Sequence, residues 1–344
     1  MRRFLAIVVG ALVLLVAPTA AAAPPTLRAL AARHDIRIGT AVDMSALAAD
    51  PVYRRQVGSE FSTVTAENVM KWEVLEPQRG QYDWSAADRL MAFARQHGQA
   101  VRGHVLVWHS QLPAWLTAGS FSSDQLRQIL RKHIFDTVGH FKGRIWQWDV
   151  VNEAFNEDGT LRDTIWLEKL GPGYIADAFR WAHEADPSAK LFYNDYNIED
   201  VNAKSDAVYQ LVKTLRAQGV PVEGVGMQAH ETVDYTPTTM RQNMQRFQRL
   251  GLDTAVTEAD VRMVMPPDAA KLGAQADVYR SMLSDCLATD RCISFTVWGF
   301  TDKYSWVPGT FEGQGAANLL DETFTPKPAY DAVRATLAAK EHRG

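Results

Sequence analysis

The chain of 344 residues is predicted to fold as a single α/β domain, a closed (β/α)8 barrel of the TIM type. Eight strand-like apolar runs alternate with segments that carry apolar residues at helical spacing, and this alternation favours a closed parallel sheet. Polar and aromatic side chains follow the runs from the second to the eighth, where active sites of such barrels lie. No Gly/Ser-rich or Pro/Thr-rich linker divides the chain, so one domain is expected.

The predicted strands are short runs rich in apolar and β-branched residues. They cover residues 36–42, 62–66, 100–108, 145–151, 190–193, 222–228, 254–257 and 292–298. Between them, apolar positions recur at helical spacing over residues 86–97, 123–140, 174–184, 203–218, 238–250 and 269–287. A last helix is expected near residues 330–340.

Residues typical of helix ends agree with these boundaries. Hydroxyl and amide side chains suited to N-caps stand at helix starts, at Ser85, at Ser122 or Ser123, and at Asn202. Glycines stand just after helix ends, at Gly98, Gly219 and Gly251. A doubly wound open sheet is the alternative architecture, but no Gly-x-Gly-x-x-Gly pattern opens a helix for it to use.

The first residues have the pattern of an export signal. Arg2 and Arg3 give a positive start, residues 4–16 are an uninterrupted apolar run, and residues 20–23 are small. The run is shorter than the roughly 17 to 25 residues that span a bilayer, which disfavours a membrane anchor. We therefore expect residues 1–23 to be a signal peptide, residues 24–344 to be the catalytic barrel, and the protein to be secreted by either the general or the twin-arginine route.

Charge and cysteine content narrow the class of protein further. The formal net charge of −4 favours neither nucleic acid nor an anionic membrane surface as a partner. The only two cysteines, Cys286 and Cys292, lie six positions apart. Oxidation to a disulfide is expected in an exported chain, and two free buried thiols are the alternative.

Two short carboxylate motifs carry the most specific chemical information. Trp-Asp-Val-Val-Asn-Glu-Ala at residues 148–154 and Val-Thr-Glu-Ala-Asp at residues 256–260 each place a glutamate directly after an apolar run. This arrangement predicts that Glu153 and Glu258 stand at the ends of two strands and face one cleft. Cleavage of a glycosidic bond commonly needs such a pair, in which one carboxyl protonates the leaving oxygen and the other attacks the sugar or activates water.

With these motifs in order along the chain, the sequence resembles glycoside hydrolase family 10, the family of retaining endo-β-1,4-xylanases. The resemblance also rests on Ile-Gly-Thr-Ala at 38–41, Glu-Asn-Val-Met-Lys-Trp at 67–72, Gly-His-Val-Leu-Val-Trp-His at 103–109, Tyr-Asn-Asp-Tyr-Asn at 193–197, Gly-Met-Gln-Ala-His at 226–230, Val-Trp-Gly at 297–299 and Lys-Pro-Ala-Tyr at 327–330. One departure is Ala259, where the family usually carries a larger apolar residue; it removes no catalytic group.

The resemblance implies roles for the residues around the scissile bond. Glu153 is the expected general acid/base and Glu258 the expected nucleophile. His230 is expected to contact the nucleophile and to be held in turn by Asp260, while Asn152 is expected to bind the sugar 2-hydroxyl next to the scissile bond. No metal and no cofactor is expected in this chemistry.

The resemblance also implies a cleft for a xylan chain. The expected contacts on the non-reducing side are polar, namely Glu67, Asn68, Lys71, His104 and Gln111. Apolar faces for sugar rings are expected from Trp108, Trp298 and Trp306, of which the last two would also crowd a hydroxymethyl group and so disfavour glucose. Gln228 is a further expected substrate contact, and Tyr196 is the expected platform on the leaving-group side.

Other interpretations of these residues are weaker but stay open. His104, His109 and His230 follow no known metal-ligand spacing, and Gly-x-Ser-x-Gly is absent. Trp72, Trp84, Trp146, Trp166 and Trp181 are expected to be packing residues. Two alternatives to the xylanase function remain. One is a retaining hydrolase of another β-glycoside, and the other is a non-catalytic carbohydrate-binding barrel. A monomer is the expected assembly.

Overall fold

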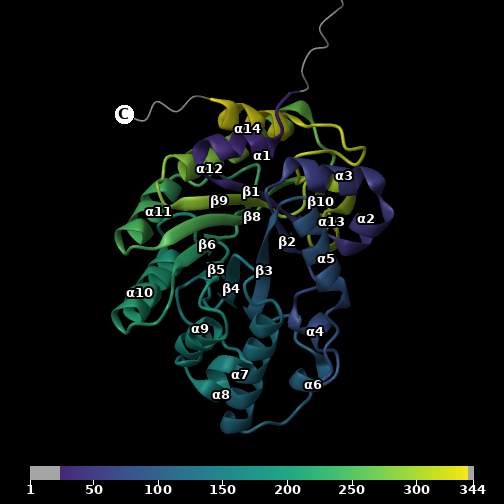
Figure 1. Cartoon of the computed structure of the whole chain (residues 1–344). Helices are drawn as coiled ribbons and strands as arrows, with labels where there is room; N and C mark the ends of the chain where they lie inside the picture. Colours follow the sequence, from purple (N-terminus) through teal and green to yellow (C-terminus); the bar gives the residue numbers. More distant parts are fainter. Residues whose placement is uncertain (1–23, 340–344) are drawn as a thin grey trace, which may run out of the picture.

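The computed structural model describes residues 24–339 and shows a closed parallel barrel surrounded by helices (Figure 1). The predicted signal peptide, residues 1–23, lies outside the described residues. The eight barrel strands are β1 (Arg37–Val42), β2 (Thr63–Ala66), β3 (Ala100–Val107), β4 (Gln147–Asn152), β5 (Lys190–Asp195), β6 (Gly224–Met227), β8 (Asp253–Val264) and β9 (Cys292–Val297). Each pairs in parallel with the next, and β9 pairs with β1, placing Ser294 opposite Arg37. This closure confirms the barrel and excludes the open sheet.

The strands are buried on both faces, as parallel strands covered by helices must be. Trp148 of β4 is 0 % exposed and lies against Gly103 of β3. A Cβ atom at position 103 would lie 2.2 Å from an atom of the Trp148 ring, so glycine at this position leaves the space that the ring occupies.

The six helices predicted from periodicity are present with shifts of at most two residues at their ends. They are α5 (Ser85–Gln96), α7 (Ser123–His140), α9 (Tyr174–Ala185), α10 (Ala203–Ala217), α11 (Met240–Arg249) and α12 (Ala269–Leu287). Ser122 and Asn202 cap α7 and α10 in reciprocal capping boxes with Gln125 and Ser205. The expected cap at Ser85 is wrong, because Ser85 is the first helical residue and Asp83 accepts the hydrogen bond from its backbone N–H.

Several elements were not predicted; all but α3, which has 10 residues, are too brief to show a clear period. They are α1 (Leu27–Ala31), α2 (Met44–Ala49), α3 (Pro51–Glu60), α4 (Trp72–Leu75), α6 (Ala114–Thr117), α8 (Ile165–Leu170), α13 (Val307–Thr310), the 3₁₀ turns η1 (Ala32–His34) and η2 (Asp302–Tyr304), and the strands β7 (His230–Thr232) and β10 (Gln314–Gly315). The expected last helix is α14 (Pro328–Ala338). β8 also continues well beyond its predicted end, so that residues 258–260 belong to a strand rather than to a loop.

The end of α12 and the start of β9 are joined by a disulfide between Cys286 and Cys292, which confirms the predicted pairing. Both cysteines are buried. Within residues 24–339, none of the helices is long and apolar enough to cross a membrane.

Candidate active site

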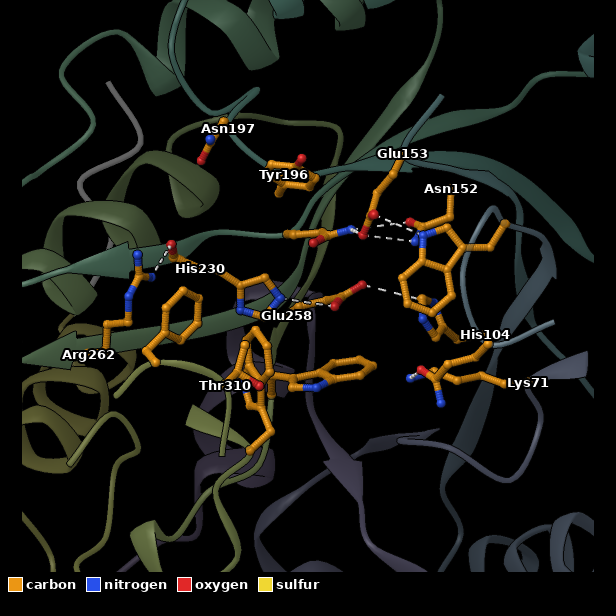
Figure 2. Close-up of a pocket in the computed structure, with 16 residues that line it drawn as sticks. Lys71, His104, Asn152, Glu153, Tyr196, Asn197, His230, Glu258, Arg262 and Thr310 are labelled. Atoms are coloured by element: carbon orange, nitrogen blue, oxygen red, sulfur yellow. Dashed lines mark hydrogen bonds and ion pairs between the residues drawn. The ribbon is translucent and has the colours of Figure 1, made fainter. Parts of the chain in front are cut away.

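The carboxyl ends of the barrel strands surround a cavity of ≈ 560 Å³ (Figure 2). Twelve of the predicted site residues line it: Lys71, His104, Trp108, Gln111, Asn152, Glu153, Tyr196, Gln228, His230, Glu258, Trp298 and Trp306. Glu67, Asn68 and Asp260 do not line the cavity, but Asn68 accepts a hydrogen bond from Lys71 and Asp260 forms an ion pair with His230. The two motif glutamates, Glu153 and Glu258, therefore lie in one cavity, as predicted from the sequence.

Glu258 of β8 is buried among nitrogen donors. Its Oε1 accepts a hydrogen bond from Asn194 Nδ2 at 2.8 Å, and Arg102 Nη2 lies 3.5 Å from the same oxygen. Its Oε2 lies 3.2 Å from His230 Nε2. Burial alone would raise the pKa of Glu258, but the electrostatic interaction with His104, the contact with His230 and the charge of Arg102 together lower it to about 2. Glu258 is therefore an ionised carboxylate at neutral pH.

His230 joins Glu258 to a second buried carboxylate, as the sequence predicted. His230 Nδ1 forms an ion pair of 3.0 Å with Asp260 Oδ2, and Trp306 Nε1 donates to the same oxygen at 2.7 Å. Burial would lower the pKa of His230, but the charge and contacts of Asp260 and Glu258 raise it to about 10. The imidazole is thus protonated, and its positive charge faces Glu258.

Glu153 follows directly after β4 in a left-handed backbone conformation, with a φ of 56°. Three neutral donors bind its carboxyl group: Trp108 Nε1 at 2.8 Å, Gln228 Nε2 at 3.0 Å and Asn152 Nδ2 at 3.2 Å. The two carboxyl groups of the cavity therefore differ in environment, since cationic groups surround Glu258 and neutral donors bind Glu153. Such an asymmetry is the usual basis for dividing acid and nucleophile roles.

Two amide side chains connect the glutamates. Asn194 Nδ2 donates both to Glu258 Oε1 and to Asn152 Oδ1, at 2.8 and 2.9 Å. Asn152 Nδ2 in turn donates to Glu153, and Thr257 Oγ1 donates to Asn194 Oδ1 at 2.7 Å, which fixes the orientation of that amide. Sequence analysis assigned no role to Asn194, although its position at the end of the fifth strand run was a signal for one.

A second residue without a predicted role is Arg102, a charged residue inside the apolar run of β3 and 2 % exposed. Its Nη1 donates to the backbone oxygen of Thr257, and its Nε lies 3.1 Å from Asp149 Oδ2. A lone arginine in an otherwise apolar strand run was a signal for such a role, because a buried charge requires a buried partner.

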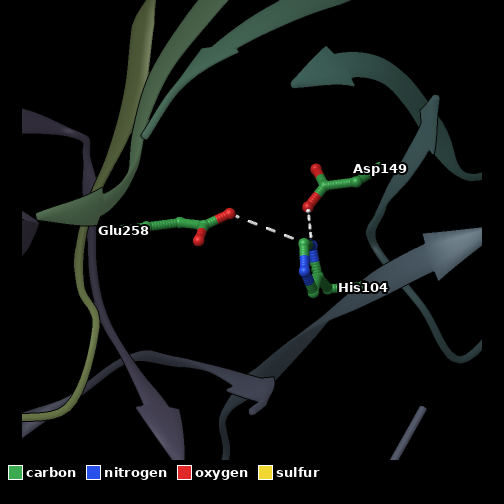
Figure 3. A group of neighbouring side chains, drawn as sticks. All are labelled: His104, Asp149 and Glu258. Carbon is green, nitrogen blue, oxygen red and sulfur yellow. Dashed lines mark hydrogen bonds and ion pairs between the residues drawn. The ribbon is translucent and has the colours of Figure 1, made fainter. Parts of the chain in front are cut away.

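The ligand-type atoms of His104, Asp149 and Glu258 lie within 4.8 Å of one another, so we tested this cluster as a metal centre (Figure 3). His104 Nδ1 lies 2.8 Å from Asp149 Oδ2, which is already shared with Arg102. The guanidinium group of Arg102 contacts both carboxylates and supplies the positive charge that a cation would bring. The cluster is thus charge-compensated by its own residues and holds the nucleophile candidate in place.

At one end of the cavity, Lys71 is 6 % exposed and organises the predicted polar wall. Its Nζ donates to Asn68 Oδ1 at 3.0 Å and to Gln111 Oε1 at 2.5 Å. Burial lowers the pKa of Lys71, although the negative charges of nearby carboxylates partly offset this effect. Burial and the charge of Asp43 raise the pKa of Glu67 to about 7.

Aromatic rings form much of the remaining wall. Trp298 packs edge-on against His104, with ring centroids 5.3 Å apart, and Trp306 lies in the same way on His230 at 5.0 Å. Tyr196 is fixed by Arg162, which donates to its hydroxyl at 2.8 Å, and by Lys204, whose Nζ lies 3.4 Å from the ring centroid. None of the five tryptophans predicted to be packing residues lines this cavity.

Four further residues that line the cavity have no role predicted from the sequence. They are Asn197, Arg262, Thr310 and Phe311. In Figure 2, Lys71 and Arg262 lie at opposite ends of the cavity, with Glu258 between them. Arg262 lies in the strand β8 just beyond Asp260, so the unexpected length of β8 is what brings it to the cavity.

The two shifted pKa values predict how the stability of the fold depends on pH. Glu258 has an ordinary pKa of 4.5 and a folded value of about 2, so its stabilising contribution is complete above pH 4.5 and is lost as the pH falls towards 2. His230 has an ordinary pKa of 6.5 and a folded value of about 10, so its contribution is complete below pH 6.5 and is lost as the pH rises towards 10.

We therefore expect these two groups to stabilise the fold most between pH 4.5 and 6.5. Urea midpoints measured from pH 2 to pH 10 for the wild type and for Glu258→Gln check this. The acid decline should be shallower in the variant, because on the order of 3 kcal/mol of pH-dependent stability is removed with the carboxylate. Parallel acid declines in the two proteins would contradict the assignment of Glu258 as the buried ionised group.

Comparison with known proteins agrees with this geometry. The sequence model of glycosyl hydrolase family 10 matches residues 26–336. An endo-1,4-β-xylanase of Agaricus bisporus is 46 % identical over 297 residues, which cover 86 % of this chain and 89 % of the relative. Endo-1,4-β-xylanase B of Thermotoga neapolitana is 43 % identical over 320 residues, covering 91 % of this chain and 92 % of the relative.

Solved structures show the same similarity in three dimensions. The native xylanase 10B of Thermotoga maritima superposes with a TM-score of 0.88 at 43 % identity and covers 91 % of this chain and 98 % of that one. The xylanase 10B of Thermotoga petrophila, solved in complex with xylobiose, gives a TM-score of 0.90 at 42 % identity and covers 92 % and 98 %. The chain belongs to glycosyl hydrolase family 10, whose members are retaining glycoside hydrolases.

Proposed function

We propose that the protein is a secreted endo-1,4-β-xylanase that cleaves internal bonds of xylan by double displacement. The unlike environments of the two cavity glutamates carry this proposal. Glu258 is an ionised carboxylate held by His230, Arg102 and Asn194, whereas Glu153 is bound by neutral donors. The membership of family 10 and the xylanase names of the relatives support the choice of substrate.

In the first step, Glu258 attacks the anomeric carbon while Glu153 protonates the departing glycosidic oxygen. The bond between the sugar and the leaving chain breaks as the bond to the Glu258 oxygen forms. In the second step, Glu153, now a carboxylate, removes a proton from water, which displaces Glu258 and restores both groups. Two inversions at the anomeric carbon give net retention.

The surrounding side chains suit a neutral polymer of pentoses. On the non-reducing side, Lys71, Gln111 and His104 line the cavity, and Asn68 accepts a hydrogen bond from Lys71. Glu67 is expected to contact the sugars on the same side. Asn152 binds the 2-hydroxyl of the sugar at the scissile bond, a contact that stabilises the transition state more than the bound substrate. Trp298 and Trp306 line the cavity, and they are expected to crowd a hydroxymethyl group and so disfavour glucose.

The start of the sequence supports the proposal of secretion. Arg2 and Arg3 precede the apolar run of residues 4–16, and the disulfide Cys286–Cys292 is of the kind that exported proteins retain. We expect the protein to be a monomer that leaves the cytoplasm with its N-terminus near residue 24. Expression in the native host and N-terminal sequencing of the protein from the culture medium test this, and a full-length chain retained in the cells would contradict it.

The substrate is tested by the release of new reducing ends from β-1,4-xylan, cellulose and mixed-linkage β-glucan at equal enzyme concentration. Rapid release of short xylo-oligosaccharides from xylan, with far slower release from the two glucans, is the expected result. Faster cleavage of a glucan would move the assignment to another β-glycoside with the same mechanism. Binding without cleavage of any of the three would indicate a carbohydrate-binding barrel instead.

A further inference from the structure

The backbone at Glu153 has an unfavourable conformation that its surroundings must hold in place. Its φ of 56° lies in the left-handed region, which residues other than glycine rarely adopt. Such a conformation is strained and persists only where the surrounding structure fixes it. Because β4 ends at Asn152, directly before this turn, the turn sets the direction in which the Glu153 side chain leaves the strand.

Three hydrogen bonds to the backbone fix both torsion angles of Glu153. Its N–H donates to the backbone oxygen of Asn194 at 2.9 Å, which fixes the peptide bond before it. Its carbonyl oxygen accepts a hydrogen bond of 2.9 Å from Arg162 Nε, and the N–H of Ala154 donates to the Tyr193 hydroxyl at 3.0 Å. This carbonyl and this N–H belong to one planar peptide bond, the one after Glu153, so that bond is held at both ends.

The hydrogen bond to Tyr193 is the one of the three that depends on a hydroxyl group. Ala154 is 2 % exposed, and its N–H has no other acceptor within residues 24–339. A buried N–H without an acceptor is costly, so loss of this hydroxyl would favour a rotation of the peptide bond towards another partner. The Tyr193 hydroxyl therefore stabilises the turn that directs Glu153.

Tyr193 reaches this turn from outside the catalytic cavity. It lies in β5 opposite Val151 of β4, is 0 % exposed and does not line the cavity. Its hydroxyl donates to Asp195 Oδ2 at 2.5 Å. Burial and the charge of Asp195 hold the pKa of Tyr193 well above its usual value, so the phenol keeps this proton and its oxygen remains an acceptor for the N–H of Ala154.

Asp195 is fixed in turn by a buried cation. Its Oδ1 lies 3.1 Å from Lys204 Nζ and accepts a hydrogen bond of 3.0 Å from the backbone N–H of Tyr196. Asp195 is 0 % exposed and Lys204, in α10, is 1 % exposed. A continuous set of buried contacts, an ion pair followed by a phenol, therefore joins the helix α10 to the peptide bond after Glu153.

We propose that Tyr193 is a positioning residue for the acid/base: its hydroxyl, oriented by Asp195, fixes the peptide bond after Glu153 and thereby aims the Glu153 carboxyl group at the glycosidic oxygen. Tyr193 touches no substrate and acts through Glu153. The proposal rests on the proposed function for the acid/base role of Glu153. It goes further by giving a role to a side chain that the cleavage chemistry does not use.

Tyr193→Phe tests this role, because it removes the hydroxyl and keeps the ring. It should lower kcat/KM on xylohexaose roughly tenfold, since a misplacement of a reacting group by about 1 Å can cost up to about 10² in rate. Covalent labelling of Glu258 by an activated 2-deoxy-2-fluoro-β-xylobioside should keep its wild-type rate, because the leaving group of this reagent departs without protonation. Steady-state kinetics and the time course of inactivation measure the two effects.

A second test combines Tyr193→Phe with Glu153→Ala. If the hydroxyl acts only through the Glu153 carboxyl, the double variant should cleave xylohexaose as slowly as Glu153→Ala and no more slowly. A further tenfold loss in the double variant would show a structural role that is independent of Glu153, and it would overturn the proposal.

Tyr174→Phe is the matched control. Tyr174 is a buried tyrosine, 4 % exposed, that is close enough to Asp195 to feel its charge. Its hydroxyl forms no hydrogen bond with any residue in the described part of the chain. The same chemical change at this position should leave both the cleavage of xylohexaose and the rate of labelling unchanged.

Equal losses of cleavage and of labelling in Tyr193→Phe would contradict the positioning role, and so would unchanged cleavage. Failure of the wild type to cleave xylohexaose, or wild-type activity in Glu153→Ala, would instead contradict the proposed function. The two failures are therefore distinguishable.

Discussion

Replacing Glu258 with Gln should reduce turnover of xylan by on the order of 10⁴ or more, while binding of xylo-oligosaccharides is retained. The amide keeps the size and most of the shape of the carboxylate but cannot form a glycosyl ester. The positive charges of His230 and Arg102, which hold the carboxylate ionised, would then surround a neutral group. Initial rates on xylan and calorimetric binding of xylotetraose measure the two parts of this prediction.

The control for Glu258→Gln is Glu322→Gln, which makes the same chemical change at an exposed position. It should leave activity, binding and the urea midpoint unchanged. If Glu258→Gln retained substantial activity while remaining folded, the nucleophile would be misassigned.

Replacing Glu153 with Ala should slow xylan cleavage by roughly 10² to 10⁴, the usual contribution of a general acid/base. An aryl β-xylobioside with a good leaving group needs little protonation, so its first step should be slowed much less. The second step still lacks its base, and the glycosyl-enzyme should therefore accumulate. A burst of phenolate followed by slow steady-state release is the expected time course.

Added azide provides the control for Glu153→Ala, because this anion attacks the intermediate without help from a base. It should accelerate turnover of the aryl substrate and give a β-xylobiosyl azide. Equal losses on xylan and on the activated substrate, with no acceleration by azide, would count against the acid/base role.

The barrel could be predicted from the sequence because its signals are local and repeated. Each strand run is apolar and β-branched, and helices such as α7 and α10 carry their own capping residues, Ser122 and Asn202. The short helices gave no such signal, although Asp50 followed by Pro51 at the start of α3 is an N-cap pattern that could have been used.

Within the site, residues that belong to distinctive motifs could be predicted to lie close together. Glu153, His230 and Glu258 were all placed correctly in one cavity. Arg102 and Asn194 were not assigned roles because their function depends on partners that are distant in sequence, 156 residues and 64 residues away at Glu258. The contact of the Tyr193 hydroxyl with the backbone of Ala154 was also beyond prediction, since its two partners lie 39 residues apart in sequence.

In the proposed mechanism, Glu258 forms a covalent bond to the sugar. The most direct measurement is to treat the wild-type protein with an activated 2-deoxy-2-fluoro-β-xylobioside, which slows release of the intermediate, and to locate the label by mass spectrometry of peptides. One label per chain is expected, on the peptide that contains Glu258, with parallel loss of activity. A label on Glu153, or turnover of xylan that continues after complete labelling elsewhere, would contradict it.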